Sequence, residues 1–547
     1  MKTLTISHLK GLEAAAQLLR AGFRLRLHDH YGGCGGGSLG LKRAGGYDVA
    51  AMLNHNATCV ATHKVNNPTT RHFCADVRAT NEFDLGRADI IWASPSCTHH
   101  SIARGGMSCD EQERALPEEL PRFALAADAK CLMIENVKEF RNWGPTEPKR
   151  DKQGRIVYRK GADGQPEPVY VPVKSRKGEY YRRWVATLKG MGYVNYECRL
   201  LDAANYGTPQ SRVRYFGIFT RAGIPISWPA ATHDRHGKGG LPRWNGVEQC
   251  LDLDDTGHSI FTRRQRGKKD YADATLSRLL AGIRKLLLPT ARQVQGSDLF
   301  AEGIQEDSHC RPRTLQQFLY QNNGTRAGDK AARSVRPVCR YSPTVTTNGG
   351  NLFLASVKLL TTYYKHGAVK RTSDACPTLR TKDCAAMATV HLDGFTFSHQ
   401  FSNTPRLLRE PARTVVASRR HQYLALIRRG PCHLAPAEGD SLVMRLLKFV
   451  CRKYGIADIL LRMLKVPELK RIMGFPEDYQ LLGTQTEQKA MLGNAVCPQV
   501  AEALGRAMLP ALLLSGRRKR PPLRHQVVER WEQGELFSQD NYRVDSR

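Results

Sequence analysis

The stretch of sequence that decides the fold is FRLRLHDHYGGCGGGSLGLKRAGGYDVAAML, residues 23–53. A short β-rich run is followed by a turn with five glycines within residues 32–37, a helix-length stretch and a second β-rich run. This order is typical of a βαβ unit, in which a crossover helix joins two parallel strands. Similar runs recur at residues 88–94, 130–136 and 213–219. The pattern therefore predicts an α/β, Rossmann-like, doubly wound sheet with helices on both faces.

The composition indicates a polyanionic partner. The 547 residues include 83 Lys and Arg against 51 Asp and Glu, a formal net charge of +32 that is spread along the chain. A protein this basic attracts polyanions, and nucleic acid is the leading candidate. A membrane surface is the rival partner, but the chain has no apolar run of 18 residues and no apolar signal core near its start. We therefore expect a cytoplasmic protein with no membrane partner.

The fifteen cysteines are scattered without a C-x-x-C pair or zinc-finger spacing. A disulfide framework and a structural zinc site are therefore not expected, and we predict no metal. Each cysteine is by default a small, reduced hydrophobic residue, so a reactive one has to be argued individually.

Composition also predicts the domain organisation. A segment rich in Lys, Arg, Gly and Pro at residues 144–179 is either a solvated loop or a DNA contact. Further on, Pro343, Pro377 and Pro411 lie 34 residues apart, and each begins a Thr-rich strand, a polar turn and an apolar strand. These units predict three hairpin-like repeats in a second, smaller, β-rich domain. The predicted parts are a catalytic domain at 1–219, the second domain at 220–457, a return to the first domain at 458–515 and a charged flexible tail at 516–547.

The glycine turn favours a cofactor site. Glycine allows a ligand to approach the backbone closely, and the following helix offers free N–H groups at its start. A flexible low-complexity loop is the alternative, and the residue order excludes a P-loop. Asn54 follows the second β-rich run and Asp76 follows the next, so both lie at strand ends, where ribose hydroxyls and an adenine amine would be bound.

Cys97 lies in the segment ASPSCTHHSIARGG, residues 93–106, directly after an apolar strand and Pro95. It could be a buried thiol, a metal ligand together with His99 and His100, or a nucleophile. The metal interpretation lacks a clear third and fourth ligand. A thiolate at a strand end, exposed to the cleft, can attack an electrophilic carbon.

Three further segments favour the nucleophile. Glu135 ends the next long strand, where its carboxyl group can donate or accept a proton. Arg212 and Arg214 are two residues apart at the start of a strand, so their side chains face the same side. Asn494 precedes a helix and can close over a cofactor. Each of these residues alone would more simply be a surface residue.

Together these segments resemble the cytosine-5 DNA methyltransferases, and they occur in that family's order. DHYGGCGGGSLGL is similar to the Asp-x-Phe-x-Gly-x-Gly-Gly cofactor motif, with Tyr31 in place of Phe, and SPSC is similar to the Ser-Pro-Pro-Cys nucleophile motif. ENV matches outright, YGTPQSRVR carries Gln-x-Arg-x-Arg, and GFPEDY and GNAVCPQV match the last two motifs. The resemblance covers roughly residues 24–219 and 458–512, and the family keeps its target-recognition domain between them.

The resemblance implies a DNA (cytosine-5-)-methyltransferase that uses S-adenosyl-L-methionine. Cys97 would attack C6 of a flipped-out cytosine, Glu135 would protonate N3, and Arg212 would hold the O2 edge and help orient Glu135, with Arg214 as the fourth catalytic residue. The implied cofactor contacts are Asp29, Tyr31, Gly33, Gly35, Gly36, Asn54, Asp76, Val77, Pro95, Asn494 and Val496. The expected DNA contacts are Gln210, Ser101, Arg104, Arg419 and Arg420.

The sequence departs from the family pattern at three positions. Ser96 replaces the second Pro of the nucleophile motif, Thr98 replaces a usual Gln, and Asn54 stands where the family has a ribose-binding Glu. An amide can still bond a hydroxyl group, so cofactor binding is expected to be weakened in part or compensated. A related enzyme that acts on RNA and a noncatalytic DNA-binding relative are the alternatives. We expect a monomer that acts on duplex DNA, with a cognate restriction endonuclease, if there is one, encoded separately.

Overall fold

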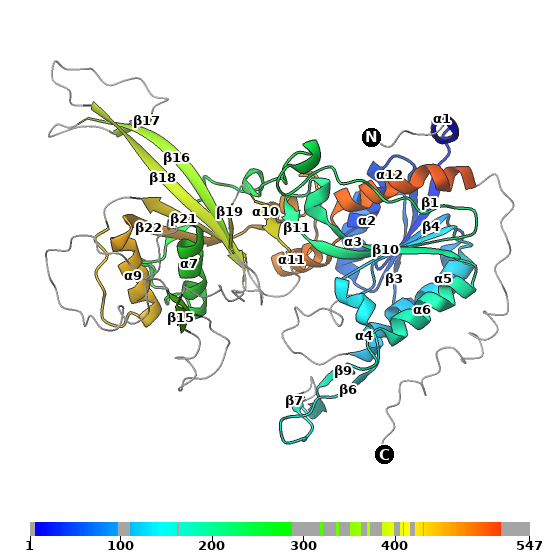
Figure 1. The fold of residues 1–547 in the computed structure, drawn as a ribbon, viewed down its shortest axis with the longest axis horizontal. Helices are drawn as coiled ribbons and strands as arrows, with labels where there is room; N and C mark the ends of the chain where they lie inside the picture. The colour runs from blue at the N-terminus through cyan, green and yellow to red at the C-terminus, as the bar shows by residue number, and fades with distance from the viewer. Residues whose placement is uncertain are drawn as a thin grey trace. The chain divides into compact units, whose positions relative to one another are not determined.

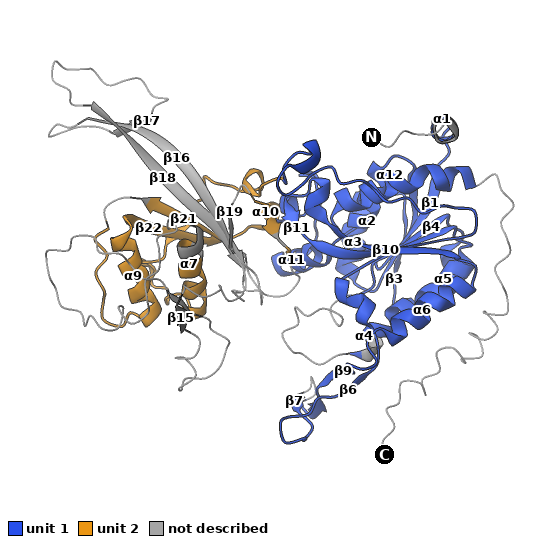
Figure 2. Cartoon of the chain, viewed as in Figure 1, with its two compact units in different colours: residues 1–244, 416–418, 469–547 blue, residues 245–415, 419–468 orange. Residues whose placement is uncertain are grey.

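The computed structural model describes residues 6–96, 110–160, 164–286 and 432–515, together with short segments between 287 and 431. Those segments are 318–320, 335–337, 350–362, 369–371, 385–398, 405–407, 410–415 and 422–429. The chain divides into two compact units (Figure 2). Unit 1 comprises residues 1–244, 416–418 and 469–547, and unit 2 comprises residues 245–415 and 419–468.

Unit 1 is built on a seven-stranded sheet in the order β10-β12-β5-β4-β1-β2-β3 (Figure 1). All neighbours pair in parallel except β12, which is antiparallel to both β10 and β5. The chain order reverses between β1 and β4, which is the switch point where doubly wound sheets bind ligands. The strands are β1 Leu25–His30, β2 Tyr47–Asn54, β3 Arg71–Cys74, β4 Ile90–Ala93, β5 Cys131–Asn136, β10 Asn195–Asp202 and β12 Val213–Thr220.

Helices cover both faces of this sheet. On one face Ile91, Leu132 and Ile134 pack with Phe123 and Trp184 of the helices α5 and α6 in a large core. The opposite face packs against helices α2 and α12, which contact each other. The helices of unit 1 are α1 Ile6–Arg20, α2 Gly36–Arg43, α3 Ala57–Asn66, α4 Glu111–Ala115, α5 Leu120–Ala126, α6 Glu179–Gly190, α11 Gln485–Asn494 and α12 Pro498–Ser515. The predicted α/β, Rossmann-like fold is confirmed.

Unit 2 is rich in β-structure. Its sheet has the order β13-β22-β21-β18-β19-β16-β17, and α7 and α9 pack on it with the buried residues Leu279, Ile283, Met444 and Leu447. The bounds are β13 His258–Ser259, α7 Asp273–Leu286, β16 Gly350–Thr362, β17 Val369–Arg371, β18 Ala385–Ser398, β19 Pro405–Leu407, β21 Gln422–Arg429, α9 Leu442–Lys453 and β22 Ile456–Met463.

The apolar strands of the three predicted repeats are β16, β18 and β21, and they pair with one another in this sheet. Pro343, Pro377 and the Thr-rich segments that follow them lie outside the described residues, so the hairpin form of the repeats stays a prediction. The same holds for the assignment of residues 220–457 to target recognition and of 516–547 to a flexible tail. No helix in the described part of the chain is long and apolar enough to cross a membrane.

Candidate active site

The predicted site residues of unit 1 gather at the carboxyl edge of the sheet. The glycine turn follows β1, Asn54 ends β2, and Asp76 lies two residues after the end of β3. Pro95 follows β4, and Glu135 is the last but one residue of β5. Parallel strands place these five positions on the same edge, which is where ligands bind in this fold.

The glycine turn is tightly constrained. Tyr31 has φ 60°, a value that a non-glycine residue rarely adopts, and Gly35, with φ 89°, precedes the first residue of α2. A Cβ atom on Gly36 would lie 2.1 Å from the carbonyl oxygen of Val496. Any side chain at residue 36 would collide with the segment that follows α11, so glycine is required at the start of α2.

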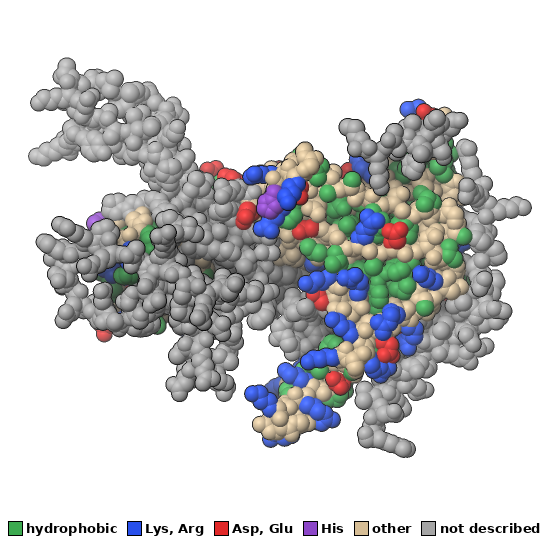
Figure 3. All heavy atoms as spheres, in the orientation of Figure 1, with side chains coloured by type: hydrophobic (Ala, Val, Ile, Leu, Met, Phe, Trp, Pro, Cys, Tyr) green, Lys and Arg blue, Asp and Glu red, His purple; other side chains and the backbone are tan. Residues whose placement is uncertain are grey.

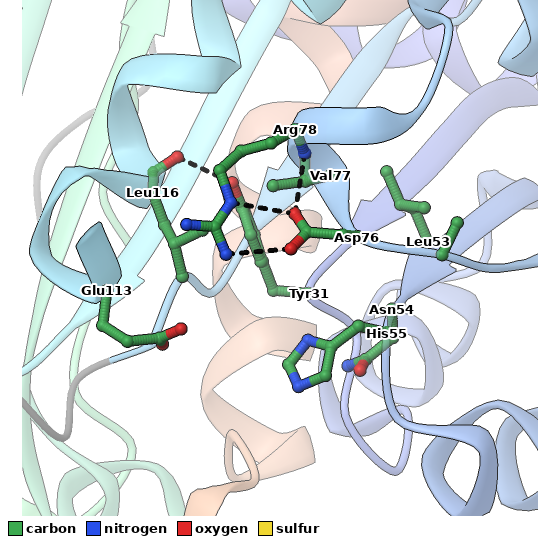
Figure 4. Close-up of a pocket in the computed structure, with 10 residues that line it drawn as sticks. Tyr31, Leu53, Asn54, His55, Asp76, Val77, Arg78, Glu113 and Leu116 are labelled. Carbon is green, nitrogen blue, oxygen red and sulfur yellow. Dashed lines mark hydrogen bonds and ion pairs between the residues drawn. The ribbon is translucent and has the colours of Figure 1, made fainter. Parts of the chain in front are cut away.

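A pocket lies beside this turn (Figure 4). It brings together four of the predicted cofactor contacts, Tyr31, Asn54, Asp76 and Val77. The other lining residues are Leu53, His55, Ala75, Arg78, Glu113 and Leu116, none of which the sequence singled out. The sequence offers one indication of these residues, which is that most of them lie within two residues of a predicted cofactor contact.

Asp76 is held in its charged form. Arg78 donates to its carboxylate through Nε at 3.1 Å and Nη2 at 2.8 Å, and the Arg78 backbone N–H donates as well (Figure 4). These bonds from Arg78 lower the pKa of Asp76. Tyr31 is fixed by a hydroxyl bond to the carbonyl of Leu116, and the Asn54 side-chain oxygen accepts from the N–H of Asn56. An aromatic ring, an apolar wall, an amide and a carboxylate form a donor and acceptor set that fits a nucleoside group.

Asp29 lies beneath the glycine turn, in the interior. Its Oδ2 accepts a bond of 2.5 Å from the Ser38 hydroxyl, which is 3.0 Å from Nε2 of His63, and Nδ1 of His63 is 2.8 Å from Nε2 of His72. Oδ1 of Asp29 has no hydrogen-bond partner in the described part of the chain, and a Cβ atom on Gly32 would lie 2.9 Å from the Cγ of Asp29. Burial raises the pKa of Asp29 to about 7 and lowers the pKa of His63 to about 3.

This raised pKa predicts a pH-dependent stability difference between the wild type and Asp29→Asn. Between about pH 4 and pH 7 the folded wild type holds a proton on Asp29 that the unfolded chain has released, so the contribution of Asp29 to the free energy of unfolding falls as pH rises. The full loss is about 4 kcal/mol. Asp29→Asn lacks this titration. We expect its free energy of unfolding to improve relative to wild type from about pH 5 to about pH 8 in denaturant titrations. A difference that stays constant or shrinks would contradict the buried, protonated carboxyl group.

Glu135 has a buried side chain whose charge is balanced by arginine. Burial raises its pKa, and Arg214 and then Arg212 oppose this rise. Nε of Arg214 lies 3.4 Å from Oε1 of Glu135, whereas Nη2 of Arg212 donates to the carbonyl of Gly493 at 3.1 Å. The sequence assigned Arg212 to hold the O2 edge and to help orient Glu135, and this role stays a prediction. Arg214 forms an ion pair with Glu135, and Arg212 bonds to a carbonyl near the end of α11.

Asn136 connects Glu135 to the turn that leads to Cys97. Its Nδ2 donates to the carbonyl of Pro95 at 3.2 Å, and its Oδ1 accepts from the N–H of Val137 at 2.8 Å. Asn136 was part of the matched ENV motif but received no role from the sequence. Its bond to Pro95 makes it a positioning residue for the segment after β4.

Several predicted residues lie outside the described part of the chain. These are Cys97, Thr98, His99, His100, Ser101, Arg104, Arg419 and Arg420. Their predicted roles therefore stay predictions. Within the described residues, no group of three or more His, Cys, Asp and Glu side chains is placed to hold a metal ion.

Two further predicted contacts differ in their surroundings. Asn494 ends α11 with an exposed side chain, and its contact with the cofactor stays a prediction. Gln210, the predicted DNA contact, is fully buried, and among the residues that the structure describes neither atom of its amide has a hydrogen-bond partner. Its role in DNA binding stays a prediction. Cys497 is also buried, and burial raises the pKa of its thiol to about 11, so it stays neutral beside the arginines.

Comparison with known proteins places these features in a family. The model of the family described as C-5 cytosine-specific DNA methylase matches residues 25–145, 167–297 and 409–509. The Type II methyltransferase M.AgeI of Thalassovita gelatinovora is 24% identical over 507 residues, which are 87% of this chain and 96% of the relative. M.NgoMIV of Neisseria gonorrhoeae is 47% identical over 182 residues, 33% of this chain and 47% of the relative. M.AquIA of Picosynechococcus is 26% identical over 211 residues, 37% of this chain and 75% of the relative.

Proposed function

The chain belongs to the C-5 cytosine-specific DNA methylase family, and from this premise we propose that it methylates C5 of a flipped-out cytosine within a specific duplex DNA site. The predicted family is confirmed, and with it the S-adenosyl-L-methionine cofactor and the class of DNA (cytosine-5-)-methyltransferase. One observation carries the proposal. Buried Glu135, which pairs with Arg214, lies on β5, and β5 is the neighbour of β4, the strand that precedes Cys97.

The reaction needs a nucleophile because C5 of cytosine is otherwise unreactive. The Cys97 thiolate adds to C6 while Glu135 gives a proton to N3, so the electrons of the C5–C6 bond become available at C5. Bound S-adenosyl-L-methionine would supply an electrophilic methyl group to C5 and leave as S-adenosyl-L-homocysteine. Loss of the C5 proton to a base would then restore the C5–C6 double bond and break the bond between sulfur and C6, and the N3 proton would return to Glu135.

The residues of the described site support these steps in different ways. Burial keeps Glu135 protonated to higher pH than a surface carboxyl group, so it can act as an acid. Asn136 fixes the carbonyl of Pro95, two residues before Cys97, relative to Glu135. Tyr31, Asn54, Asp76 and Val77 would hold the nucleoside part of the cofactor beside the glycine turn.

The test is transfer of a tritiated methyl group to duplex DNA and to RNA by the purified chain. We expect label in DNA only. Label in RNA alone would favour the RNA-modifying alternative, and no label in either would favour a noncatalytic DNA-binding protein.

The relatives M.AgeI and M.NgoMIV are Type II methyltransferases, so we further propose a restriction–modification role with a separately encoded endonuclease.

We propose that residues 220–457 recognise the target sequence, with Arg419 and Arg420 in the major groove. The double change Arg419→Ala and Arg420→Ala is expected to relax the set of methylated sites while leaving cofactor affinity unchanged. Sequencing of methylated DNA from a host that expresses each variant measures site choice.

The matched control is Lys268→Ala with Lys269→Ala, which removes the same charge from exposed positions in unit 2. Unchanged site choice in the arginine variant, or an equal change in the lysine variant, would refute the recognition role.

A further inference from the structure

An inserted hairpin separates the catalytic strand β5 from α6. It contains four short strands, which pair as β6 with β9 and β7 with β8, both antiparallel. Their bounds are β6 Thr146–Pro148, β7 Tyr158–Lys160, β8 Pro166–Pro168 and β9 Tyr170–Pro172. Figure 1 shows these strands projecting from the body of unit 1. This is the segment for which the sequence left a solvated loop and a DNA contact as alternatives.

The described part of the hairpin is an ordered structure. Lys149 donates its N–H to the carbonyl of Val169 at 2.7 Å, Val169 donates to Val157 at 2.9 Å, and Val157 donates to Lys149 at 2.8 Å. These three bonds join the segments around Lys149, Val157 and Val169 to one another. At the base, Trp143 is fully buried, and a Cβ atom on Gly144 would lie 2.4 Å from the carbonyl oxygen of Arg176. The backbone of the hairpin is thus fixed to the core of unit 1.

The hairpin is strongly basic. Residues 145–178 include nine Lys or Arg and four Asp or Glu, a net charge of +5. All nine basic side chains are exposed, and Lys and Arg gather along the hairpin in Figure 3. Three of them form ion pairs, which are Arg155 with Asp151, Arg159 with Glu167 and Arg176 with Glu179. The other six have no carboxylate partner among the described residues, namely Lys149, Arg150, Lys152, Lys160, Lys174 and Lys177.

The hairpin also leaves the sheet at the functional edge. It follows β5 and the short helix η5 (Lys138–Asn142), so it starts from the carboxyl edge, where Glu135 and Pro95 lie. A duplex that inserts a base at this edge must bring its phosphates near it.

We propose that this basic hairpin binds the phosphate backbone of the substrate DNA outside the recognised site, independently of sequence. This inference rests on the proposed function for the identity of the polyanion. Exposed lysines that lack carboxylate partners are free to replace condensed counterions on DNA, and such contacts add affinity without reading bases. The hairpin then acts as a clamp that raises affinity and leaves the choice of site to unit 2.

The test is the triple variant Lys149→Gln, Lys152→Gln and Lys160→Gln in the full chain. Binding to two long synthetic duplexes of unrelated sequence is measured by fluorescence anisotropy over a range of KCl concentrations. We expect both duplexes to bind more weakly by the same factor. The slope of log K against log salt should become less negative by about 0.9 for each phosphate that the variant no longer neutralises, or about 2 to 3 in total. In methyl transfer, KM for DNA should rise and kcat stay unchanged.

The control variant is Arg20→Gln, Arg87→Gln and Lys189→Gln, which removes three exposed charges at the amino edge of the same sheet. An unchanged slope in the hairpin variant, or an equal change in the control, would overturn the inference. Weaker binding to only one duplex would also overturn it, because that result means base reading. If the hairpin variant shows the predicted change of slope but the wild type transfers no methyl group, the proposed function would be refuted and the hairpin contact would stand.

Discussion

Cys97→Ser is expected to abolish methyl transfer to DNA while leaving the protein folded and able to bind DNA. Without the thiolate, no covalent bond to C6 forms, and C5 does not become nucleophilic. Removal of an enzyme nucleophile typically lowers kcat by about 10⁴-fold or more, so methyl transfer should fall below detection. The measurement is incorporation of a tritiated methyl group, with DNA affinity determined on the same preparation.

The matched control is Cys59→Ser on α3. Burial raises the pKa of the Cys59 thiol to about 11, so this cysteine is neutral and no loss of transfer is expected. A Cys97→Ser protein that keeps substantial activity would show that another group is the nucleophile, and the mechanism would then be wrong.

Glu135→Gln is expected to lower kcat by about 10² to 10⁴-fold, because the variant has no proton to give to N3. An amide of the same shape keeps the buried position but leaves Arg214 without its ion pair. Cofactor affinity should change little, since Glu135 does not line the pocket beside the glycine turn. Glu13→Gln, an exposed position on α1, serves as the control and should retain full activity.

The pH profile separates a proton donor from a merely structural carboxyl group. Burial raises the pKa of Glu135, so the protonated form persists to higher pH, and the wild-type rate should fall as pH rises through this pKa. Glu135→Gln should lack that descending limb. A profile of the same shape in both proteins would show that Glu135 does not supply the proton.

The fold and the strand-end residues were predictable because they depend on local patterns. Alternation of apolar runs with helix-length segments specifies the parallel sheet, and parallel strands bring Asn54, Asp76 and Glu135 to one edge whatever the details of packing. The resemblance to a known family then added roles that no single residue could establish.

Contacts between distant segments were not predictable. Arg212 and Arg214 belong to the same short motif. The pairing of β12 with β5 brings Arg214 to Glu135, and the packing of α11 brings Gly493 to Arg212. The bonds from Ser38 to Asp29 and towards His63 depend on how α2 and α3 sit beside β1. No periodicity encodes such distances, because they arise from tertiary packing.

The most direct test of the covalent mechanism uses duplex DNA with 5-fluorocytosine at the methylated position, incubated with the protein and S-adenosyl-L-methionine. Fluorine at C5 cannot leave as a proton, so the bond between sulfur and C6 should persist after methyl transfer. The mechanism predicts a denaturant-resistant protein–DNA complex whose digestion and mass spectrometry place the methylated base on Cys97. Methyl transfer to ordinary DNA without any such complex, or an adduct on a different cysteine, would contradict it.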